Sequence, residues 1–435
     1  MNVGIIGAGY AGTALALFLA RAGHRVSLYE RVPEPGPVGA GILLQPTGMC
    51  VLDALGLLDA VLERGALVRE LVIRRETQRR VMTLAYSDMD ELSFAQGMHR
   101  GALYEVLLRA AQRQDIALDC GCEIARARPS NGASGGWRLW DAAGALAGEH
   151  ELLVVAGGAH SALDVSPAPA RHSKEYPWGA AWGVLPDPER IFAGALHQRV
   201  RGTRRMLGFL PTGLGPRSAR NQTPLVSVFW SLQRDTALAW REQGIDAWRD
   251  EALSMAPEAA PVLAQLRTLD DLVFTSYADV SIARLNGRAL VYVGDAAHAM
   301  SPQLGQGANL ALLDAWVLAQ CLTAPEPRTL DERLHRFASQ RAAHLDYYQW
   351  ATRFLTPFFQ SGYSGLGLLR DLAMPVVTRF PLFRRLMLES MAGVRTGLLP
   401  KQRLNLAQPP AAARWVAAAL GRSAHEWRDP HPQTR

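Results

Sequence analysis

The chain has 435 residues, 49% of them hydrophobic, so it can bury a large core in about two or three domains. Its formal net charge of +6 comes almost entirely from arginines spread along the chain, with Lys174 and Lys401 as the only lysines, which argues against a surface built to bind nucleic acid. The four cysteines are too few and too scattered for a disulfide framework or a metal site, which favours a cytoplasmic protein without a metal.

The first residues carry the pattern of a nucleotide-binding turn. An apolar strand over residues 3–6 is followed by three glycines and a helix over residues 13–22. A second strand ends at Glu30, about 20 residues beyond the glycines, as the dinucleotide fingerprint requires. In such a turn the glycines bring a pyrophosphate onto a helix N-terminus, and the acidic residue bonds a ribose hydroxyl. The residues predicted to contact a dinucleotide here are Gly7, Gly9, Ala11, Gly12, Glu30 and Arg31.

The middle of the chain predicts a second sheet. Residues 67–75 and 80–86 alternate as a β-hairpin does, and a β-meander attached to the nucleotide-binding sheet follows over residues 116–150. From residue 176 to 280 the pattern favours a mainly antiparallel sheet with one face covered by helices. The strands are expected over residues 178–185, 190–198, 204–210, 224–232 and 272–278, and the helices over residues 236–243 and 245–265.

Aromatic and imidazole side chains of this region are candidates for substrate contacts. Trp178 and Trp182 are an even number of residues apart on one expected strand, so both point to one side, either into an aromatic pocket or into the core. None of the candidates for a base has a partner visible in the sequence, so we assign no catalytic residue. The candidates for a base that would deprotonate a phenol are Tyr86, His99, His197 and Tyr277.

The stretch from Val293 to Asp314 predicts a strand, a ligand-binding loop and a helix. Asp295 places a carboxylate just past the strand end, and Pro302 stiffens the loop. Gly305-Gln306-Gly307 opens the helix, whose unpaired N–H groups attract a phosphate or an electron-rich ring edge.

Residues 294–309 resemble the second FAD motif of the single-component (class A) FAD-dependent aromatic hydroxylases. These are the monooxygenases related to the para-hydroxybenzoate, salicylate and ubiquinone-pathway hydroxylases. The shared pattern is GDAAH, three residues, Pro, two residues, GQG, one residue and Asn. The resemblance implies that the Asp holds the flavin ribityl chain and that the Pro and Gly-Gln-Gly lie along the isoalloxazine. It also implies that residues 39–45 border the flavin and that Arg100 reaches the FAD. The matching positions are Asp295, Pro302, Gly305, Gln306, Gly307 and Asn309.

The segment after the expected strand 152–156 departs from the family's pattern. In relatives this strand leads into Asp-Gly, two residues, Ser and then an Arg, a motif that serves both FAD and the nicotinamide cofactor. Here Gly157 takes the place of the Asp, Ser161 is retained, and Asp164 stands near the Arg position. Either the protein docks NAD(P)H through other groups, or a partner supplies the electrons.

The expected fold class is α/β: a Rossmann-like FAD-binding domain, an inserted and mainly antiparallel β-sheet substrate domain, and a C-terminal helical region. We assign residues 1–75, 98–175 and 281–350 to the FAD-binding domain, residues 76–97 and 176–280 to the substrate domain, and residues 351–435 to the C-terminal helical region.

Two apolar stretches raise the question of a membrane. Residues 3–20 carry no charge, but no basic residue precedes them, so no integral membrane span is expected. Residues 367–395 mix bulky apolar side chains with arginines at roughly helical spacing. They either pack on the core, form a lid over an apolar substrate or lie on a membrane surface. Residues 407–435 predict a frayed C-terminus.

The resemblance implies an enzyme, a FAD-dependent monooxygenase that hydroxylates an aromatic or other electron-rich small molecule through a flavin C4a-hydroperoxide, using O₂ and NAD(P)H. The chain has no second dinucleotide fingerprint, so NAD(P)H is expected as a transient reductant. The partner is expected to be an aromatic or apolar small molecule, and a homodimer is one option.

Three other classes were weighed against this function. Gly157 suggests a flavoenzyme reduced by a partner reductase, or a non-oxygenating flavoprotein like the isoprenoid reductases and cyclases. A flavin-dependent halogenase would need a lysine in the N-terminal part, and residues 1–173 contain none. A non-catalytic scaffold would be expected to lose Glu30 and Asp295, which are present.

Overall fold

The computed structural model describes residues 1–36, 39–130, 135–217, 222–326 and 328–404, together with 406, 409, 411, 412 and 415. They form two compact units. The first contains residues 1–38, 104–176 and 277–352, and the second contains residues 39–103, 177–276 and 353–435. One boundary lies between residues 38 and 39. The other four fall within α4 (Arg100–Ala111), β13 (Arg171–Pro186), β17 (Val273–Ile282) and α10 (Leu330–Phe359).

The units divide the chain differently from the sequence-based domains. Residues 39–75 group with the second unit, although we assigned them to the FAD-binding domain. Residues 353–435 also group with the second unit. The expected frayed segment 407–435 lies almost entirely outside the described residues.

A six-stranded sheet is the centre of the first unit. Its order is β18-β19-β11-β1-β2-β7, and all neighbours pair in parallel except β18, which is antiparallel to β19. β1 and β11 are almost entirely buried because both faces of the sheet are covered, which explains their continuous apolar sequences. The strands are β1 (Asn2–Ile6), β2 (Arg25–Glu30), β7 (Ile116–Cys120), β11 (Leu152–Val155), β18 (Asn286–Gly287) and β19 (Leu290–Tyr292).

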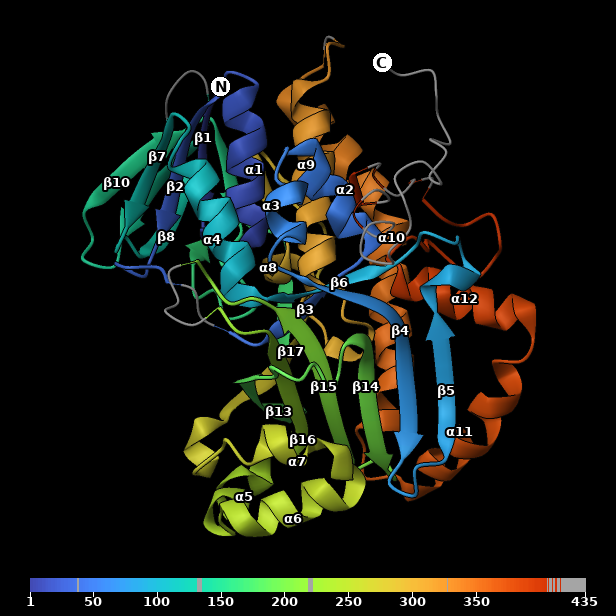
Figure 1. The fold of residues 1–435 in the computed structure, drawn as a ribbon. Helices are drawn as coiled ribbons and strands as arrows, with labels where there is room; N and C mark the ends of the chain where they lie inside the picture. The colour runs from blue at the N-terminus through green and yellow to red at the C-terminus, as the bar shows by residue number, and fades with distance from the viewer. Residues whose placement is uncertain are drawn as a thin grey trace. The chain divides into compact units, whose positions relative to one another are not determined.

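Helices cover one face of this sheet and a smaller sheet covers the other (Figure 1). α1 (Tyr10–Arg21) packs against α9 (Gly307–Thr323) on the helical side. On the other side, Trp137 and Leu139 of the smaller sheet share a buried cluster with Ile6 and Val155. This sheet has the order β10-β9-β8-β12 and contains β8 (Ile124–Pro129), β9 (Trp137–Asp141), β10 (Leu146–His150) and β12 (Asp164–Val165).

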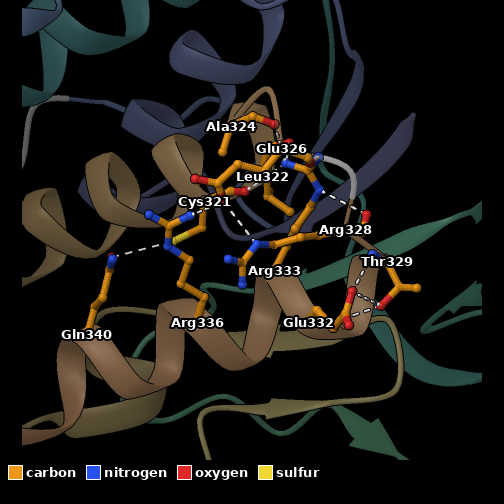
Figure 2. Close-up of polar contacts among 10 residues, drawn as sticks. All are labelled: Cys321, Leu322, Ala324, Glu326, Arg328, Thr329, Glu332, Arg333, Arg336 and Gln340. Atoms are coloured by element: carbon orange, nitrogen blue, oxygen red, sulfur yellow. Dashed lines mark hydrogen bonds and ion pairs between the residues drawn. The ribbon is translucent and has the colours of Figure 1, made fainter.

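Polar contacts in the turn between α9 and α10 hold the two helices together (Figure 2). Arg333 lies in the first turn of α10 and donates from Nη1 to three carbonyl oxygens at the end of α9, which have no helical partners. A guanidinium is favourable there because the C-terminal end of a helix is partly negative. The three oxygens belong to Cys321, Leu322 and Ala324, at 3.0, 3.0 and 2.8 Å.

A nine-stranded, mainly antiparallel sheet forms the second unit, which confirms the expected α/β fold class. Its order is β17-β13-β16-β15-β14-β4-β6-β3, with β5 paired to β4. β4 and β5 are the predicted hairpin. The strands not yet given are β3 (Gly41–Leu44), β4 (Ala66–Arg75), β5 (Arg80–Ala85), β6 (Ala95–His99), β14 (Gly194–Arg201), β15 (Arg205–Gly213) and β16 (Leu225–Gln233).

The two faces of this sheet pack against different helices (Figure 1). Val228 and Trp230 of β16 face a cluster with Trp248 of α6. On the other face, Met82 of β5 packs in a cluster with Leu388 of α12. The helices of this unit are α2 (Pro46–Ala54), α3 (Leu58–Leu62), α5 (Ala237–Glu242), α6 (Ile245–Met255), α7 (Ala260–Leu263), α11 (Ser364–Val377) and α12 (Pro381–Met391).

The expected continuous helix over residues 245–265 is wrong. α6 ends at Met255, and Ala256 has a non-helical backbone with φ −143° and ψ 78°. Pro257 follows and has no N–H to donate within a continuing helix, so the chain starts a new turn there.

Candidate functional site

The first glycine-rich loop joins β1 to α1, and its glycines have separate roles. Gly7 adopts a φ of 102°, and a Cβ there would lie 2.5 Å from the carbonyl oxygen of Ala156. A Cβ at Gly12 would lie 2.0 Å from the carbonyl oxygen of Gly7, so neither position accepts a side chain. At Gly9, by contrast, no described atom lies within 4 Å of the Cβ position. The turn is closed at its first and third glycines and open over the second, where a ligand can approach the backbone.

α1 begins at this loop without a side-chain cap. Gly9 is the N-cap, and no acidic residue lies in the first turn. The first N–H groups of a helix lack helical partners, and the helix dipole makes this end partly positive. The N-terminus of α1 is therefore suited to a phosphate held over Gly9.

Glu30 ends β2 beside the same loop. Its Oε2 accepts a hydrogen bond from the backbone N–H of Ala8 at 3.0 Å, and its Oε1 accepts one from Val32 at 3.0 Å. These bonds fix the carboxylate, and each oxygen still has a lone pair for a hydroxyl. Arg31 follows with an exposed side chain.

The second loop follows β19 and lies against α1. Gly294 has a φ of 61°, and its Cβ position is 3.1 Å from Cβ of Ala11. α8 (Asp295–His298) begins at Asp295, whose side chain is exposed although the next three residues are buried. An exposed carboxylate at this place is available to accept hydrogen bonds from the hydroxyls of a ligand.

A short turn, η5 (Pro302–Leu304), and the start of α9 complete the second loop. Gly305 has a φ of 61°, and the described part of the chain leaves the space at its Cβ position open. The Cβ position of Gly307 is 3.7 Å from Oδ1 of Asp295, so this carboxylate lies beside the N-terminus of α9. The buried amides of Gln306 and Asn309 donate to the carbonyl oxygens of Leu304 and Gly305 at 3.3 and 3.2 Å.

The first unit holds twelve of the thirteen predicted cofactor residues, and they lie around the carboxyl ends of β1, β2 and β19. This is the edge at which open parallel α/β sheets bind their ligands. Arg100 is the exception, because it starts α4 in the second unit. There its side chain lies on Gly39, whose Cβ position is 2.7 Å from Cδ of Arg100, and its N–H donates to Ala40 at 3.1 Å.

A buried ionic cluster supports the second loop from within the protein. Oδ2 of Asp314, on α9, accepts from the backbone N–H of Gly294 at 2.8 Å and lies 2.6 Å from Nε2 of His298. Its Oδ1 accepts from Nε of Arg341, on α10, at 2.7 Å. Asp314, His298 and Arg341 are each no more than 2% exposed.

The partners of Asp314 decide its charge. Burial alone would raise the pKa of this carboxyl group, but the charges of His298 and Arg341 and the hydrogen bonds from His298 and Gly294 outweigh burial and hold the pKa well below its usual value. The sequence analysis missed this role of Asp314. The available signal was a single carboxylate inside an otherwise apolar helix, because such a charge is buried only with partners.

The loop after β11 lacks the carboxylate of the family's motif. The Cβ position of Gly157 is 3.0 Å from Oγ of Ser161, which leaves little room for a larger side chain. Asp164 lies on β12 and pairs with Arg128 of β8, so it belongs to the smaller sheet.

Arg171 supplies a cation to this loop from further along the chain. It donates from Nη2 to the carbonyl oxygen of Ala159 at 2.6 Å and from Nε to that of Ala296 at 2.8 Å. It therefore ties the segment after β11 to α8. Arg171 was not predicted from the sequence, because the family's motif places its arginine near residue 164.

Two of the four candidates for a base, Tyr86 and His99, make hydrogen bonds with a structural role. Tyr86 is fully buried, donates to Oε1 of Gln45 at 2.7 Å, and has a pKa raised by burial. Nδ1 of His99 accepts from the N–H of Gly101 at 3.0 Å and so caps α4. Burial, with nearby arginines, lowers the pKa of His197 to about 4. Tyr277 lies on β17. No catalytic residue is assigned among them.

Two kinds of feature are absent from the described residues. No helix among them is long and apolar enough to cross a membrane. Within the same ranges, no group of His, Cys, Asp and Glu is arranged to hold a metal ion.

Comparison with known proteins adds to this geometry. The sequence matches the family described as "FAD binding domain" over residues 1–347. A 2-heptyl-3-hydroxy-4(1H)-quinolone synthase of Pseudomonas aeruginosa (strain UCBPP-PA14) is 29% identical over 368 residues, which cover 80% of this chain and 86% of that protein. A kynurenine 3-monooxygenase of Xanthomonas euvesicatoria pv. vesicatoria is 30% identical over 380 residues, which cover 79% of this chain and 75% of that protein.

Among solved structures, HpxO of Klebsiella pneumoniae complexed with FAD and uric acid resembles this fold. The TM-score is 0.71 at 20% sequence identity, and the match covers 90% of this chain and 97% of that chain. The open position at Gly9, the uncapped start of α1 and the exposed carboxylate of Asp295 are features into which an FAD molecule fits.

Proposed function

The chain belongs to the FAD-binding-domain family and, within it, to the FAD-dependent aromatic hydroxylases, and we propose that it hydroxylates an apolar aromatic small molecule with NAD(P)H and O₂. As a member of this family it is a FAD-dependent monooxygenase. The observation that carries the proposal is the approach of Gly294 to Ala11, which sets the two glycine-bearing loops side by side.

Each loop has a separate part in holding FAD under this proposal. The N-terminus of α1 at Gly9 would hold the pyrophosphate, and Glu30 would accept hydrogen bonds from the ribose hydroxyls. Asp295 would accept from the hydroxyls of the ribityl chain. The glycines at the start of α9, together with Pro302, would leave room for the ring, which a side chain at residue 305 or 307 would obstruct.

When bound and reduced by NAD(P)H, FAD would supply the redox chemistry that places one oxygen atom of O₂ on the substrate and releases the other as water. The chain's own residues bind and orient the groups around this chemistry. The N–H groups of α1 compensate the phosphate charge, and the buried cluster of Asp314, His298 and Arg341 holds the second loop in place.

Reduction by NAD(P)H is direct in this proposal, although Gly157 removes one carboxylate from the family's motif. Arg171 keeps the segment after β11 fastened to α8 without it. One of the two relatives is named as a monooxygenase and the other as the synthase of a 3-hydroxy-quinolone, which does not favour a non-oxygenating flavoprotein.

The substrate class rests on the relatives and on one face of the second unit's sheet. The relatives are named for a quinolone product and for kynurenine, and the HpxO structure holds uric acid. In this chain, Trp182 and Phe229 are cross-strand neighbours on the face opposite the one that α6 covers, and both are partly exposed. They are suited to contact an aromatic ring. Trp178, on the same face, is buried and belongs to the core.

A glycine substitution tests the cofactor site. Gly9 has φ −72° and ψ −170°, a conformation that alanine adopts, and its Cβ position is open. Gly9→Ala should therefore leave the apoprotein's stability unchanged. It should weaken FAD binding about tenfold or more, because a methyl group forced into a filled space costs about 1–3 kcal/mol. FAD affinity is measured by titration of the apoprotein and stability by thermal unfolding.

Gly365→Ala is the matched control, since no described atom lies within 4 Å of that Cβ position either. If Gly9→Ala binds FAD as tightly as Gly365→Ala does, the pyrophosphate does not pass over this turn.

Anaerobic mixing with NADH or NADPH tests the reaction. Rapid bleaching of the flavin, followed by hydroxylated product when O₂ and a substrate are added, is the expected result. Bleaching only in the presence of a reductase would exclude direct reduction. Peroxide as the only product, with every aromatic compound that accelerates reduction, would exclude hydroxylation.

We also propose a homodimer and a cytoplasmic location, and the cysteine pattern supports the location. Light scattering of the purified holoenzyme measures the first, and cell fractionation measures the second.

A further inference from the structure

The second unit exposes an apolar face on α11, α12 and the segment that follows α12. Ten of the seventeen exposed large hydrophobic side chains among the described residues lie between residues 363 and 399. We call these ten side chains the apolar face. On α11, Leu368, Leu372 and Val376 follow one another at intervals of four residues, which places them on one side of the helix. They are between 51% and 61% exposed.

The opposite side of the same helices holds them on the protein. α11 and α12 lie alongside β5 (Figure 1). Leu388 and Met391 of α12 share a buried cluster with Val81 and Leu84 of β5, and Met374 of α11 packs against it. The buried core of the described residues therefore forms without the ten side chains of the apolar face. So many exposed apolar side chains indicate an interaction site.

The exposed charged side chains of residues 360–404 are positive. Residues 360–404 contain six arginines and one lysine but only two carboxylates, Asp371 and Glu389. Both carboxylates are at most 9% exposed. Asp371 pairs with Arg370 at 2.7 Å, and Glu389 pairs with three arginines at 2.8 to 3.0 Å. Arg379 and Lys401 are exposed beside the apolar side chains, so this surface is both apolar and cationic.

A cleft of about 710 Å³ lies next to the apolar face, between β5 and the two helices. Its apolar part is formed by Val81, Met82 and Leu388. Its charged lining consists of Arg80, Arg379, Arg384, Arg385 and one carboxylate, Asp88, which pairs with Arg384. Arg384 and Arg385 already pair with Asp88 and Glu389, so Arg80 and Arg379 are the guanidinium groups suited to an anionic group that carries apolar chains beside it.

We propose that the apolar face docks this enzyme on an anionic phospholipid bilayer, with the arginine-lined cleft taking a phosphate headgroup. Helices that lie in a membrane interface bury apolar side chains at the acyl boundary and hold anionic lipids with arginines and lysines. The positive charge argues against a second copy of this chain as the occupant. In a two-fold dimer the same patch would face itself, and the arginines of one copy would meet those of the other.

Vesicle flotation of the FAD-loaded, full-length enzyme tests this proposal. The enzyme should float with vesicles of phosphatidylcholine and phosphatidylglycerol and remain behind with vesicles of phosphatidylcholine alone, and high salt should weaken binding. Arg379→Gln should lower the partition coefficient about fivefold, the contribution of one arginine at an anionic surface. Leu372→Ser should lower it about tenfold, because one leucine side chain is no longer buried.

Two controls match these substitutions. Leu238→Ser removes a leucine that is 78% exposed on α5, and Arg113→Gln removes an exposed arginine after α4. Both should partition as the wild type does, and all variants should keep the wild-type FAD content and melting temperature.

Three results would overturn the proposal. The first is a wild-type enzyme that does not float with anionic vesicles. The second is equal partition of Arg379→Gln, Leu372→Ser and the controls, which would mean that net charge alone attracts the protein. The third is a concentration-dependent dimer that Leu372→Ser abolishes, without vesicle binding, which would make the apolar face a contact between copies.

Discussion

Replacing Asp314 with asparagine changes one atom and should destabilise the first unit strongly. Three donors converge on the two carboxylate oxygens: Gly294 and His298 on Oδ2, and Arg341 on Oδ1. An asparagine has one carbonyl oxygen and one NH₂ group, so in either orientation a donor faces a donor. The guanidinium of Arg341, which is 1% exposed, would also lose the carboxylate that neutralises its charge. A buried charge without a partner is costly.

The expected loss is about 3 to 5 kcal/mol, the cost of breaking a buried ion pair from one side. For a unit of this size that corresponds to a fall in melting temperature of roughly 10 °C. The folded pKa of Asp314 is lowered, so its stabilisation is complete above the unfolded pKa of about 3.9 and is lost as the pH falls through the lower folded pKa. The difference between wild type and variant should therefore be largest at neutral pH and shrink in acid.

Calorimetry measures the melting temperature of the variant. The release of flavin on heating, followed by its fluorescence, measures the loss of the cofactor site. Asp270→Asn is the control, because it removes a carboxylate that is 80% exposed and lies 3.5 Å from Arg241. A surface pair of this kind contributes about 1 kcal/mol at most. If Asp314→Asn melts as Asp270→Asn does, the buried cluster does not support the second loop and the reasoning fails.

Three further substitutions test other parts of the site. Tyr86→Phe should cost about 1 kcal/mol of stability, since it removes a buried hydrogen bond, and should leave the pH profile of hydroxylation unchanged; a shifted profile would make Tyr86 a participant in proton transfer. Arg171→Gln should lower the melting temperature and speed FAD release, because two carbonyl oxygens lose their donors at a cost of about 2 kcal/mol; Arg109→Gln, at a surface pair, is its control, and equal FAD release from both would contradict the role. Trp182→Ala should raise KM about tenfold with a smaller change in kcat, as expected for lost contact with an aromatic ring; an unchanged KM would place the substrate elsewhere.

The glycine-bearing loops could be predicted from sequence because their constraints are local. The lack of room for a side chain at Gly12 comes from the carbonyl oxygen of Gly7, five residues earlier. The φ of 102° at Gly7 belongs to the tight turn after the predicted strand. The same holds for Gly294 and Gly305, which both have a φ of 61°. The spacing of each motif therefore predicts most of the backbone conformation of its loop.

The groups that support these loops could not be predicted in the same way. Asp314 meets His298 and Arg341 only because α9 and α10 pack together, and no spacing along the chain encodes that contact. Arg171 reaches Ala159 and Ala296 from the start of β13, whereas counting from the strand end pointed to residue 164. Tertiary packing, and not the spacing along the chain, brings the guanidinium of Arg171 to the loop after β11.

The buried cluster bears on how FAD would bind. The second loop is fastened at Gly294 by Asp314, while Asp295, the next residue, is exposed. Gly294 therefore positions Asp295, the carboxylate predicted to hold FAD, and a hydrogen bond within the protein holds Gly294 in place. A loop ordered before the ligand arrives loses little conformational entropy on binding, so more of the interaction energy remains as affinity. Weakened FAD binding in Asp314→Asn at a temperature where the first unit is still folded would separate this positioning effect from stability, because a purely structural role would leave the affinity of the folded protein unchanged.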